Sequence, residues 1–275
     1  MKTMLEYSNK NSFVHKLTGA TKMLFLLAYV IASMISYDTR LLAGLLILSF
    51  VIFKVSKVEF KEISFVFYFI LVFLVINSLA IFLISPYQGC EIYGTKTVLF
   101  KITNYYQITS EQLFYQLNYI LKYLLITPMA LIFMVATDPS EFAASLNKIG
   151  ISYRVAYSVA IALRYVPDIQ REYHDIAFAQ QARGVDMSKK ASVMTRVKNS
   201  SVIIMPLIFS SLEKIDKISC AMEIRAFGNK KKRTWYSAKK FSKSDYAVMI
   251  FGLCLVILSG YLIYVNGGRF YNPFI

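Results

Sequence analysis

The chain has little of what a metal site or an enzyme is built from. Its three cysteines, Cys90, Cys220 and Cys254, lie far apart and form no CxxC or Cys/His spacing, so a zinc site or a disulfide framework has little support. Asp, His and Cys do not cluster in the sequence, as an intramembrane enzyme such as a lipid-modifying transferase needs. Acidic residues are scarce as well, with 16 against 31 Lys and Arg. We therefore expect neither a metal centre nor a catalytic one.

A complete phosphate-binding loop is also lacking. The nearest match is GCEIYGTKT, from Gly89 to Thr97. Such a loop needs Gly-Lys-Ser/Thr, because its backbone amides and its lysine must converge on one phosphate. Thr95 separates Gly94 from Lys96, so we expect that this chain does not hydrolyse ATP.

Apolar residues are abundant and occur in runs. Of the 275 residues 56% are hydrophobic, and the mean hydropathy is +0.49. A membrane-spanning helix needs about 20 apolar residues. Five runs predict such helices and hence an all-α integral membrane protein; the first two are short, and the third has 23 residues without a charge. The runs are Ala20–Tyr37, Leu41–Val55, Ile63–Ser85, Tyr119–Ala136 and Tyr246–Val265.

The basic residues predict the orientation in the membrane. Segments 1–22, 54–62 and 137–245 contain 26 of the 31 Lys and Arg, and cytoplasmic segments of membrane proteins collect such residues. We expect a cytoplasmic N-terminus and an outside C-terminus, with the stem of Lys122 reaching from the fourth span to the outer interface. The net charge of +15 is then explained by the orientation in the membrane, so it is no longer an argument for nucleic-acid binding.

This topology divides the chain into three regions. Residues 1–136 form a transmembrane region of four spans, and its outside loop at about 86–118 is expected to contain a strand or hairpin. Residues 137–245 form a cytoplasmic region of helices between the fourth and fifth spans. Residues 246–275 form the last span and a short outside tail.

The cytoplasmic region has helical signals throughout. TDPSEF predicts a helix start at residues 137–142, and Gly150 predicts its end. Further helices are expected at about 152–165, at 168–183 after a break or kink at Pro167, and at about 195–227 with a bend at Pro206. Their apolar stripes predict long amphipathic helices that lie against the bundle or along the membrane surface.

Three basic residues, one near the N-terminus and two in the cytoplasmic region, have predicted roles that need no partner protein. His15 is expected to be structural. Arg154 and Arg164 are expected either to contact lipid headgroups or to pair with Asp168 or Glu172.

Two of these helices end in a similar motif, AQQARGVD at 179–186 and AMEIRAFG at 221–228. In one interpretation Arg183 and Arg225 only stabilise helix ends that are capped by Gly184 and Gly228. In the other, each arginine projects into a groove of a partner and binds acidic side chains or carbonyl groups there. The small residues Ala182 and Ala226 would leave room for such a groove.

Three stretches resemble the transmembrane T component of energy-coupling factor transporters, a family of ATP-driven micronutrient importers that includes cobalt-transport membrane subunits. They are SFVHKLTGATKML at 12–24, the block at 138–186, and AMEIRAFG. The resemblance covers nearly the whole chain. The second motif departs from the family, since Ile224 stands where Ala is frequent, which leaves open which ATPase it would accept.

The resemblance implies a coupling subunit. Such a subunit docks on two cytoplasmic ABC-type ATPases, which bind the ATP, and holds a small membrane S component that binds a vitamin or a metal. Ala182-Arg183-Gly184 and Arg225-Ala226 would seat in the grooves of the two ATPases, with Gly228 closing the second motif. The chain itself would carry no cofactor.

A conventional ABC permease that forms its own substrate pathway is the alternative. A solute-binding transporter usually keeps ionisable groups at the middle of the bilayer. The five predicted spans contain no Asp or Glu, and Lys122 is their only basic residue away from the ends. The residues therefore favour a coupling subunit, and they do not reveal the transported nutrient.

Overall fold

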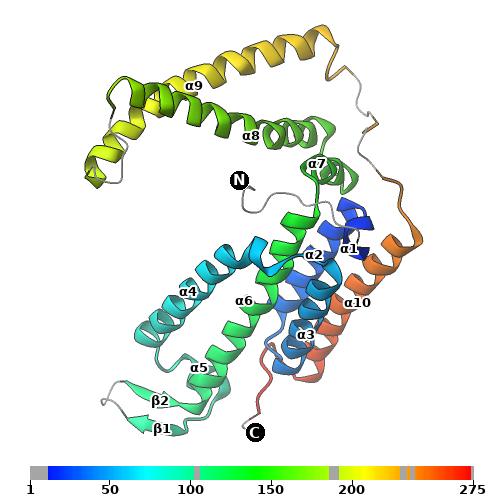
Figure 1. The fold of residues 1–275 in the computed structure, drawn as a ribbon. Helices are drawn as coiled ribbons and strands as arrows, with labels where there is room; N and C mark the ends of the chain where they lie inside the picture. Colours follow the sequence, from blue (N-terminus) through cyan, green and yellow to red (C-terminus); the bar gives the residue numbers. More distant parts are fainter. Residues whose placement is uncertain (1–11, 102–105, 186–191, 230–233, 236–238, 274–275) are drawn as a thin grey trace. The chain divides into compact units, whose positions relative to one another are not determined.

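The computed structural model describes residues 12–101, 106–185, 192–229, 234–235 and 239–273 (Figure 1). The chain divides into two compact units. Residues 1–145 and 239–275 form the membrane-spanning unit, and residues 146–238 form the α8–α9 unit.

Helices make up most of the membrane-spanning unit. Four helices are long and apolar enough to cross a membrane within the described ranges, and α2 is a shorter apolar helix, so the prediction of a mostly helical, multi-pass membrane protein is confirmed. The elements are α1 (Phe13–Lys16), α2 (Gly19–Ile35), α3 (Thr39–Ser56), α4 (Phe60–Ile84), α5 (Gln88–Tyr93), β1 (Val98–Lys101), β2 (Gln107–Thr109), α6 (Ser110–Ala136), α7 (Pro139–Lys148) and α10 (Lys243–Val265).

Polar side chains fix where several of these helices begin. Thr18 caps α2 by accepting the Thr21 amide, and Asp38 caps α3 by accepting the Arg40 amide. Ser242 and Asp245 form a reciprocal capping box at the start of α10. These caps satisfy amides that the first turn of a helix leaves without a partner.

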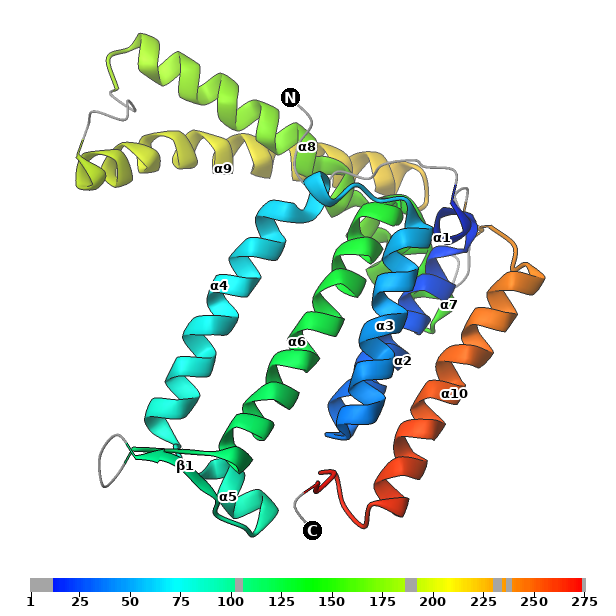
Figure 2. The same ribbon diagram turned by 60° about the horizontal axis from the view of Figure 1, so that its bottom comes forward.

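The core lies among four helices that run side by side (Figure 2). Helix α2 packs along α10, and α3 packs along α6. The fully buried Tyr29 joins α2 to α3, since its hydroxyl donates to the Leu45 carbonyl at 2.7 Å. The buried core residues are Phe25, Tyr29, Ala32, Leu41, Leu42, Leu45, Leu125, Met129, Ile132, Ala136 and Leu255.

The loop after α4 is shorter than the sequence suggested, because α6 begins at Ser110 rather than at Tyr119. Its first turns carry polar residues that the hydropathy pattern placed in the loop. Both are hydrogen-bonded: the buried Gln112 accepts the Gly89 amide at 2.8 Å, and the half-buried Gln116 donates to the Ser78 carbonyl at 3.1 Å. The expected hairpin is present as β1 and β2.

The segment that resembled a phosphate loop is occupied by the chain's own carboxylate. Glu111, which is fully buried, accepts the Thr97 amide at 3.0 Å and the Thr95 hydroxyl at 3.1 Å. A phosphate would have to displace this carboxylate.

Lys122 does not reach the interface as expected, and that prediction is wrong. It is 3% exposed, and its Nζ donates to the Met34 carbonyl at 3.2 Å. Arg269 donates to the Met34 and Ile35 carbonyls at 3.1 and 3.0 Å. The last carbonyls of α2 lack helical partners, and these two cations supply donors to them.

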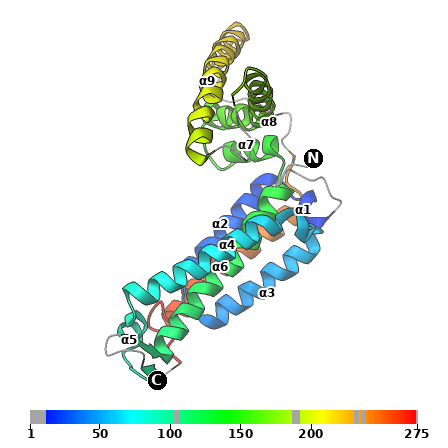
Figure 3. The same cartoon turned by 60° about the vertical axis from the view of Figure 1, so that its left-hand side comes forward.

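The α8–α9 unit is built on two long antiparallel helices, α8 (Tyr153–Ala182) and α9 (Val193–Ile224) (Figure 3). Of the break or kink expected at Pro167, the break is wrong, because α8 is one helix of 30 residues that includes Pro167. A proline removes one helical hydrogen bond, and the packing of α8 on α9 continues on both sides of that position: Tyr153 contacts Phe227, and Glu172 contacts Lys214.

Candidate functional site

The first arginine motif ends α8 in a Schellman turn. Arg183 is the C-cap, the Gly184 amide donates to the Gln181 carbonyl at 2.9 Å, and the Val185 amide donates to the Gln180 carbonyl at 3.0 Å. Gly184 has a φ of +90°, so it is the left-handed cap that the sequence predicts. Asp186, the last residue of the motif, lies outside the described residues.

The second motif ends α9 with the same hydrogen bonds, but Gly228 is not the capping residue. The Ala226 amide donates to the Glu223 carbonyl at 2.8 Å, and the Phe227 amide donates to the Met222 carbonyl at 2.9 Å. Ala226 takes the left-handed position with a φ of 51°, although this conformation costs an L-residue about 1–2 kcal/mol. Arg225 and Ala226 therefore correspond to Arg183 and Gly184, and the expected cap at Gly228 is wrong by two residues.

Both arginines are available to a partner. Arg183 and Arg225 are exposed, and neither guanidinium forms an ion pair within the described part of the chain. Ala182 and Ala226 are exposed beside them. Ile224, the residue that departs from the family motif, is 82% exposed and presents an apolar side chain next to Arg225.

The second motif is fastened to the first turn of α8. Arg154 Nη2 donates to the Gly228 carbonyl at 3.0 Å. Of its two expected contacts, the ion pair with Asp168 or Glu172 is not formed among the described residues, where these acids pair with Arg171 and Lys214. The Tyr157 and Phe227 rings lie 4.7 Å apart, and Trp235 is 5.3 Å from the Tyr153 ring. These contacts hold the turn that carries Arg225 in one position relative to α8.

A cavity of about 390 Å³ lies beside Arg225. Arg164 lines it as well, so two guanidinium groups border one hollow. Such an arrangement suits a carboxylate from a partner, because guanidinium groups bind carboxylates with two parallel hydrogen bonds. The lining residues are Tyr157, Ile161, Arg164, Tyr165, Ile218, Ala221, Met222, Arg225 and Phe227.

One ion pair joins the middle of α8 to α9. Lys214 Nζ lies 2.6 Å from Glu172 Oε2, and the Ser210 hydroxyl donates to the same carboxylate. The hydrogen bonds from Lys214 and Ser210 lower the pKa of Glu172. Asp168 pairs with Arg171 at 2.8 Å, and among the described residues neither Asp168 nor Glu172 forms an ion pair with Arg164.

A second cluster lies in the membrane-spanning unit, where the chain leaves for the α8–α9 unit and where it returns. We call Thr18, Gly19, Glu141, Lys239 and Asp245 the anchor cluster. On the outgoing side, Glu141 is 6% exposed and accepts the Gly19 amide at 2.9 Å. Lys239, on the returning side, lies 3.3 Å from the same carboxylate.

Asp245 completes the anchor cluster from the returning side. It is 1% exposed and accepts the Thr18 amide at 2.9 Å and the Thr18 hydroxyl at 3.1 Å. Both connections to the α8–α9 unit are therefore bonded to the N-terminus of α2. A side chain at Gly19 would not fit, because its Cβ would lie 2.6 Å from Ser145 Oγ.

Residues of the N-terminal motif support this cluster. Lys22 Nζ donates to the Ala136 carbonyl at the end of α6 at 2.8 Å. His15 is buried, and its Nδ1 lies 2.7 Å from Ser12 Oγ, in agreement with the expected structural role. No group of three His, Cys, Asp or Glu suited to a metal occurs among the described residues.

No sequence pattern points to the anchor cluster or to the hollow beside Arg225. Glu141 fits the ordinary preference for an acid in the first turn of a helix, and nothing local points to Gly19, which is 122 positions away. Arg164 likewise reaches the hollow only because α8 and α9 are antiparallel.

Comparison with known proteins agrees with the motifs. The family model described as "Cobalt transport protein", CbiQ, matches residues 10–236. The chain is 27% identical over 269 residues to the energy-coupling factor transporter transmembrane protein EcfT of Clostridium kluyveri, covering 94% of this chain and 95% of the relative. It is 26% identical over 268 residues to EcfT of Lactococcus lactis, covering 94% and 97%. EcfT of Leuconostoc gelidum is 28% identical over 247 residues, covering 86% and 87%. The chain belongs to the CbiQ family of cobalt transport proteins.

Proposed function

We propose that this chain carries ATP-driven motion from two cytoplasmic ATPases to a small membrane S component that binds a vitamin or a metal. Its family and its full-length similarity to EcfT make it the non-catalytic, multi-pass transmembrane component of an energy-coupling factor transporter. The partners, the docking residues and the orientation are parts of the proposal.

The observation that carries the proposal is the pair of matching helix ends. Arg183 and Arg225 occupy the same position in two Schellman turns, and both side chains are exposed. If the two arginines only stabilised their own helix ends, the two ends would not need the same structure. If they dock, two related ATPase grooves would each receive one helix end. We assign Ala182, Arg183 and Gly184 to one groove, and Arg225, Ala226 and Gly228 to the other.

The distribution of charge supports the orientation. Segments 1–22, 54–62 and 137–245 hold most of the basic residues and would be cytoplasmic, with the C-terminus outside. The α8–α9 unit then faces the ATPases, and the nucleotide binds to those subunits rather than to this chain.

The anchor cluster would pass the motion on. When the ATPases move α8 and α9, force reaches the membrane-spanning unit through the two covalent connections at α7 and before α10. Both connections are bonded to Thr18 and Gly19 through Glu141 and Asp245. A displacement of either connection would therefore move α2.

Co-purification from native membranes tests the proposal. A coupling subunit should bring down two ATPase chains and one further small membrane protein, in a ratio measurable by quantitative mass spectrometry. A two-fold dimer of this chain with ATPases alone would instead indicate a permease with its own pathway.

A further inference from the structure

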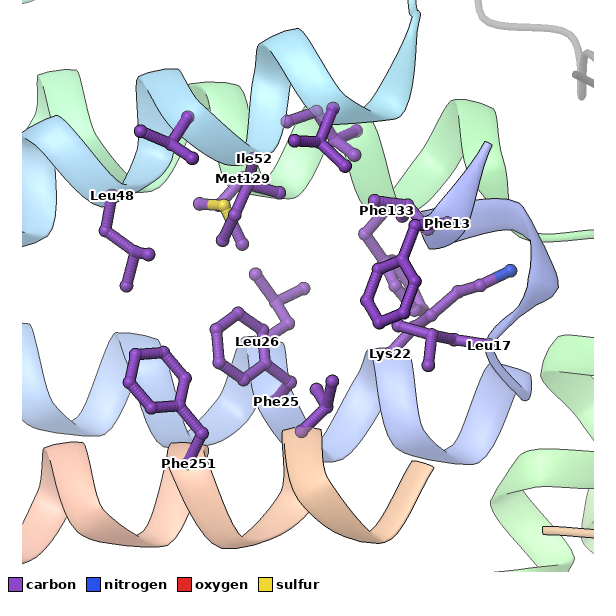
Figure 4. A pocket seen from close by; sticks show the side chains of 15 residues that line it. Phe13, Leu17, Lys22, Phe25, Leu26, Leu48, Ile52, Met129, Phe133 and Phe251 are labelled. Atoms are coloured by element: carbon purple, nitrogen blue, oxygen red, sulfur yellow. The ribbon is translucent and has the colours of Figure 1, made fainter. Parts of the chain in front are cut away.

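An apolar groove enters the membrane-spanning unit between α2 and α3 (Figure 4). These helices follow each other in the chain, but α2 packs along α10 and α3 packs along α6, which leaves space between them. The cavity has a volume of about 260 Å³, larger than the ~150 Å³ apolar cavity that binds benzene in another protein. Its walls include Phe13, Leu26, Leu48, Ile52, Met129 and Phe251.

The groove is open at its side and apolar inside. Val51 is 52% exposed and Phe13 is 51% exposed, so these lining residues form a rim rather than part of a closed core. Lys22 is the only charged residue of the lining, and its Nζ is bonded to the Ala136 carbonyl. The groove therefore offers no polar group that would orient a water-soluble nutrient.

We propose that this groove binds one acyl chain of an anionic phospholipid from the surrounding bilayer. Most of its walls belong to the apolar helices α2, α3, α6 and α10, so its open side faces hydrocarbon. An empty groove would lose dispersion contacts along its whole lining, and water does not fill an apolar cavity. A flexible acyl chain restores those contacts without a polar partner.

The basic residues at one end of the groove select the headgroup. Lys16 lies on α1, and Lys54 and Lys57 lie at the end of α3; all three are exposed, and both elements supply groove walls. Segment 54–62 contains three lysines and two acids, Glu59 and Glu62, so with Lys16 the cations predominate. In the orientation proposed above, this end faces the cytoplasmic leaflet, where lysines near the surface attract anionic lipids.

Native mass spectrometry of the assembled transporter tests the site. The complex is stripped of lipid, incubated with dioleoyl phosphatidylglycerol or dioleoyl phosphatidylcholine, and analysed for retained lipid. We expect the wild type to retain one phosphatidylglycerol per copy of this chain. Val51→Trp, which fills the groove, should lose it. Ile76→Trp, at a 58% exposed position of α4 away from the groove, is the matched control and should retain it.

The headgroup is tested by Lys54→Gln with Lys57→Gln, which leaves the groove itself intact. Each lost lysine should weaken binding of phosphatidylglycerol about fivefold. Lys101→Gln, on β1, is the control and should have no effect. Equal retention of the two lipids by the wild type would overturn the headgroup assignment.

Two other results would overturn the acyl-chain site. One is unchanged retention of phosphatidylglycerol in Val51→Trp. The other is loss of the small membrane partner from Val51→Trp with lipid retention intact, which would mean that a helix of that partner occupies the groove.

Discussion

Replacing Glu141 by Ala should both destabilise the membrane-spanning unit and uncouple transport from ATP hydrolysis. The carboxylate is buried and accepts the Gly19 amide, and a hydrogen bond to a charged group contributes about 1.5–3 kcal/mol. The Lys239 side chain is 51% exposed, so its ion pair adds about 1 kcal/mol or less. We expect a total loss of about 2–4 kcal/mol.

The two effects need separate assays. Equilibrium unfolding in detergent micelles measures the free energy of unfolding, and proteoliposomes that contain the whole transporter measure nutrient uptake per ATP hydrolysed. We expect uptake per ATP to fall while ATP hydrolysis continues, because the α8–α9 unit still binds the ATPases. Glu91→Ala, which removes an exposed carboxylate on α5, should change neither quantity.

Glu141→Gln separates charge from hydrogen bonding. The amide oxygen still accepts the Gly19 amide, so the loss of stability should be about 1 kcal/mol or less. The coupling role is refuted if Glu141→Ala loses stability but keeps its uptake per ATP. The hydrogen-bond account is refuted if Glu141→Ala unfolds like the wild type.

Two further predictions concern the α8–α9 unit. Ala226→Gly should stabilise the chain by up to about 1 kcal/mol and Gly184→Ala should destabilise it by about 1 kcal/mol, because both residues adopt the left-handed backbone conformation that glycine favours. Chemical denaturation measures the free energy of unfolding of both variants. Effects of the same sign would contradict the shared turn. Because the pKa of Glu172 is lowered in the folded chain, its ion pair stabilises the fold above the ordinary pKa of a glutamate and loses this effect as the pH falls through the lowered value. Thermal melts should therefore place Glu172→Gln below the wild type at pH 7, with a gap that closes under acid; a gap independent of pH would rule out this linkage.

The sequence predicts the apolar helices well and their ends poorly. A long run without charges, such as Ile63–Ser85, predicts a membrane-spanning helix, and α4 covers this run up to Ile84. The start of α6 was missed because Gln112 and Gln116 look like loop residues until their partners at Gly89 and Ser78 are known. The burial of Lys122 is unpredictable for the same reason, since its acceptor is the end of another helix.

The candidate site was predictable to the same extent. Arg183 and Arg225 are visible as helix ends because a small residue and an arginine precede a glycine. The true correspondence of Ala226 with Gly184 was hidden, since an alanine in the left-handed conformation has no local signal. The anchor cluster depends on contacts between residues that lie 98 to 227 positions apart, which local sequence patterns do not reveal.

The most direct test of the central claim is the double charge reversal Arg183→Glu with Arg225→Glu. Breaking one side of a buried charge pair costs about 3–5 kcal/mol, so each reversal should weaken ATPase binding a hundredfold or more. Arg171→Glu, at an exposed position of α8 outside both motifs, is the matched control. The account predicts that the double variant inserts into the membrane but no longer co-purifies with the ATPases or supports uptake, while each single variant retains part of both. Normal ATPase association and uptake in the double variant would contradict it.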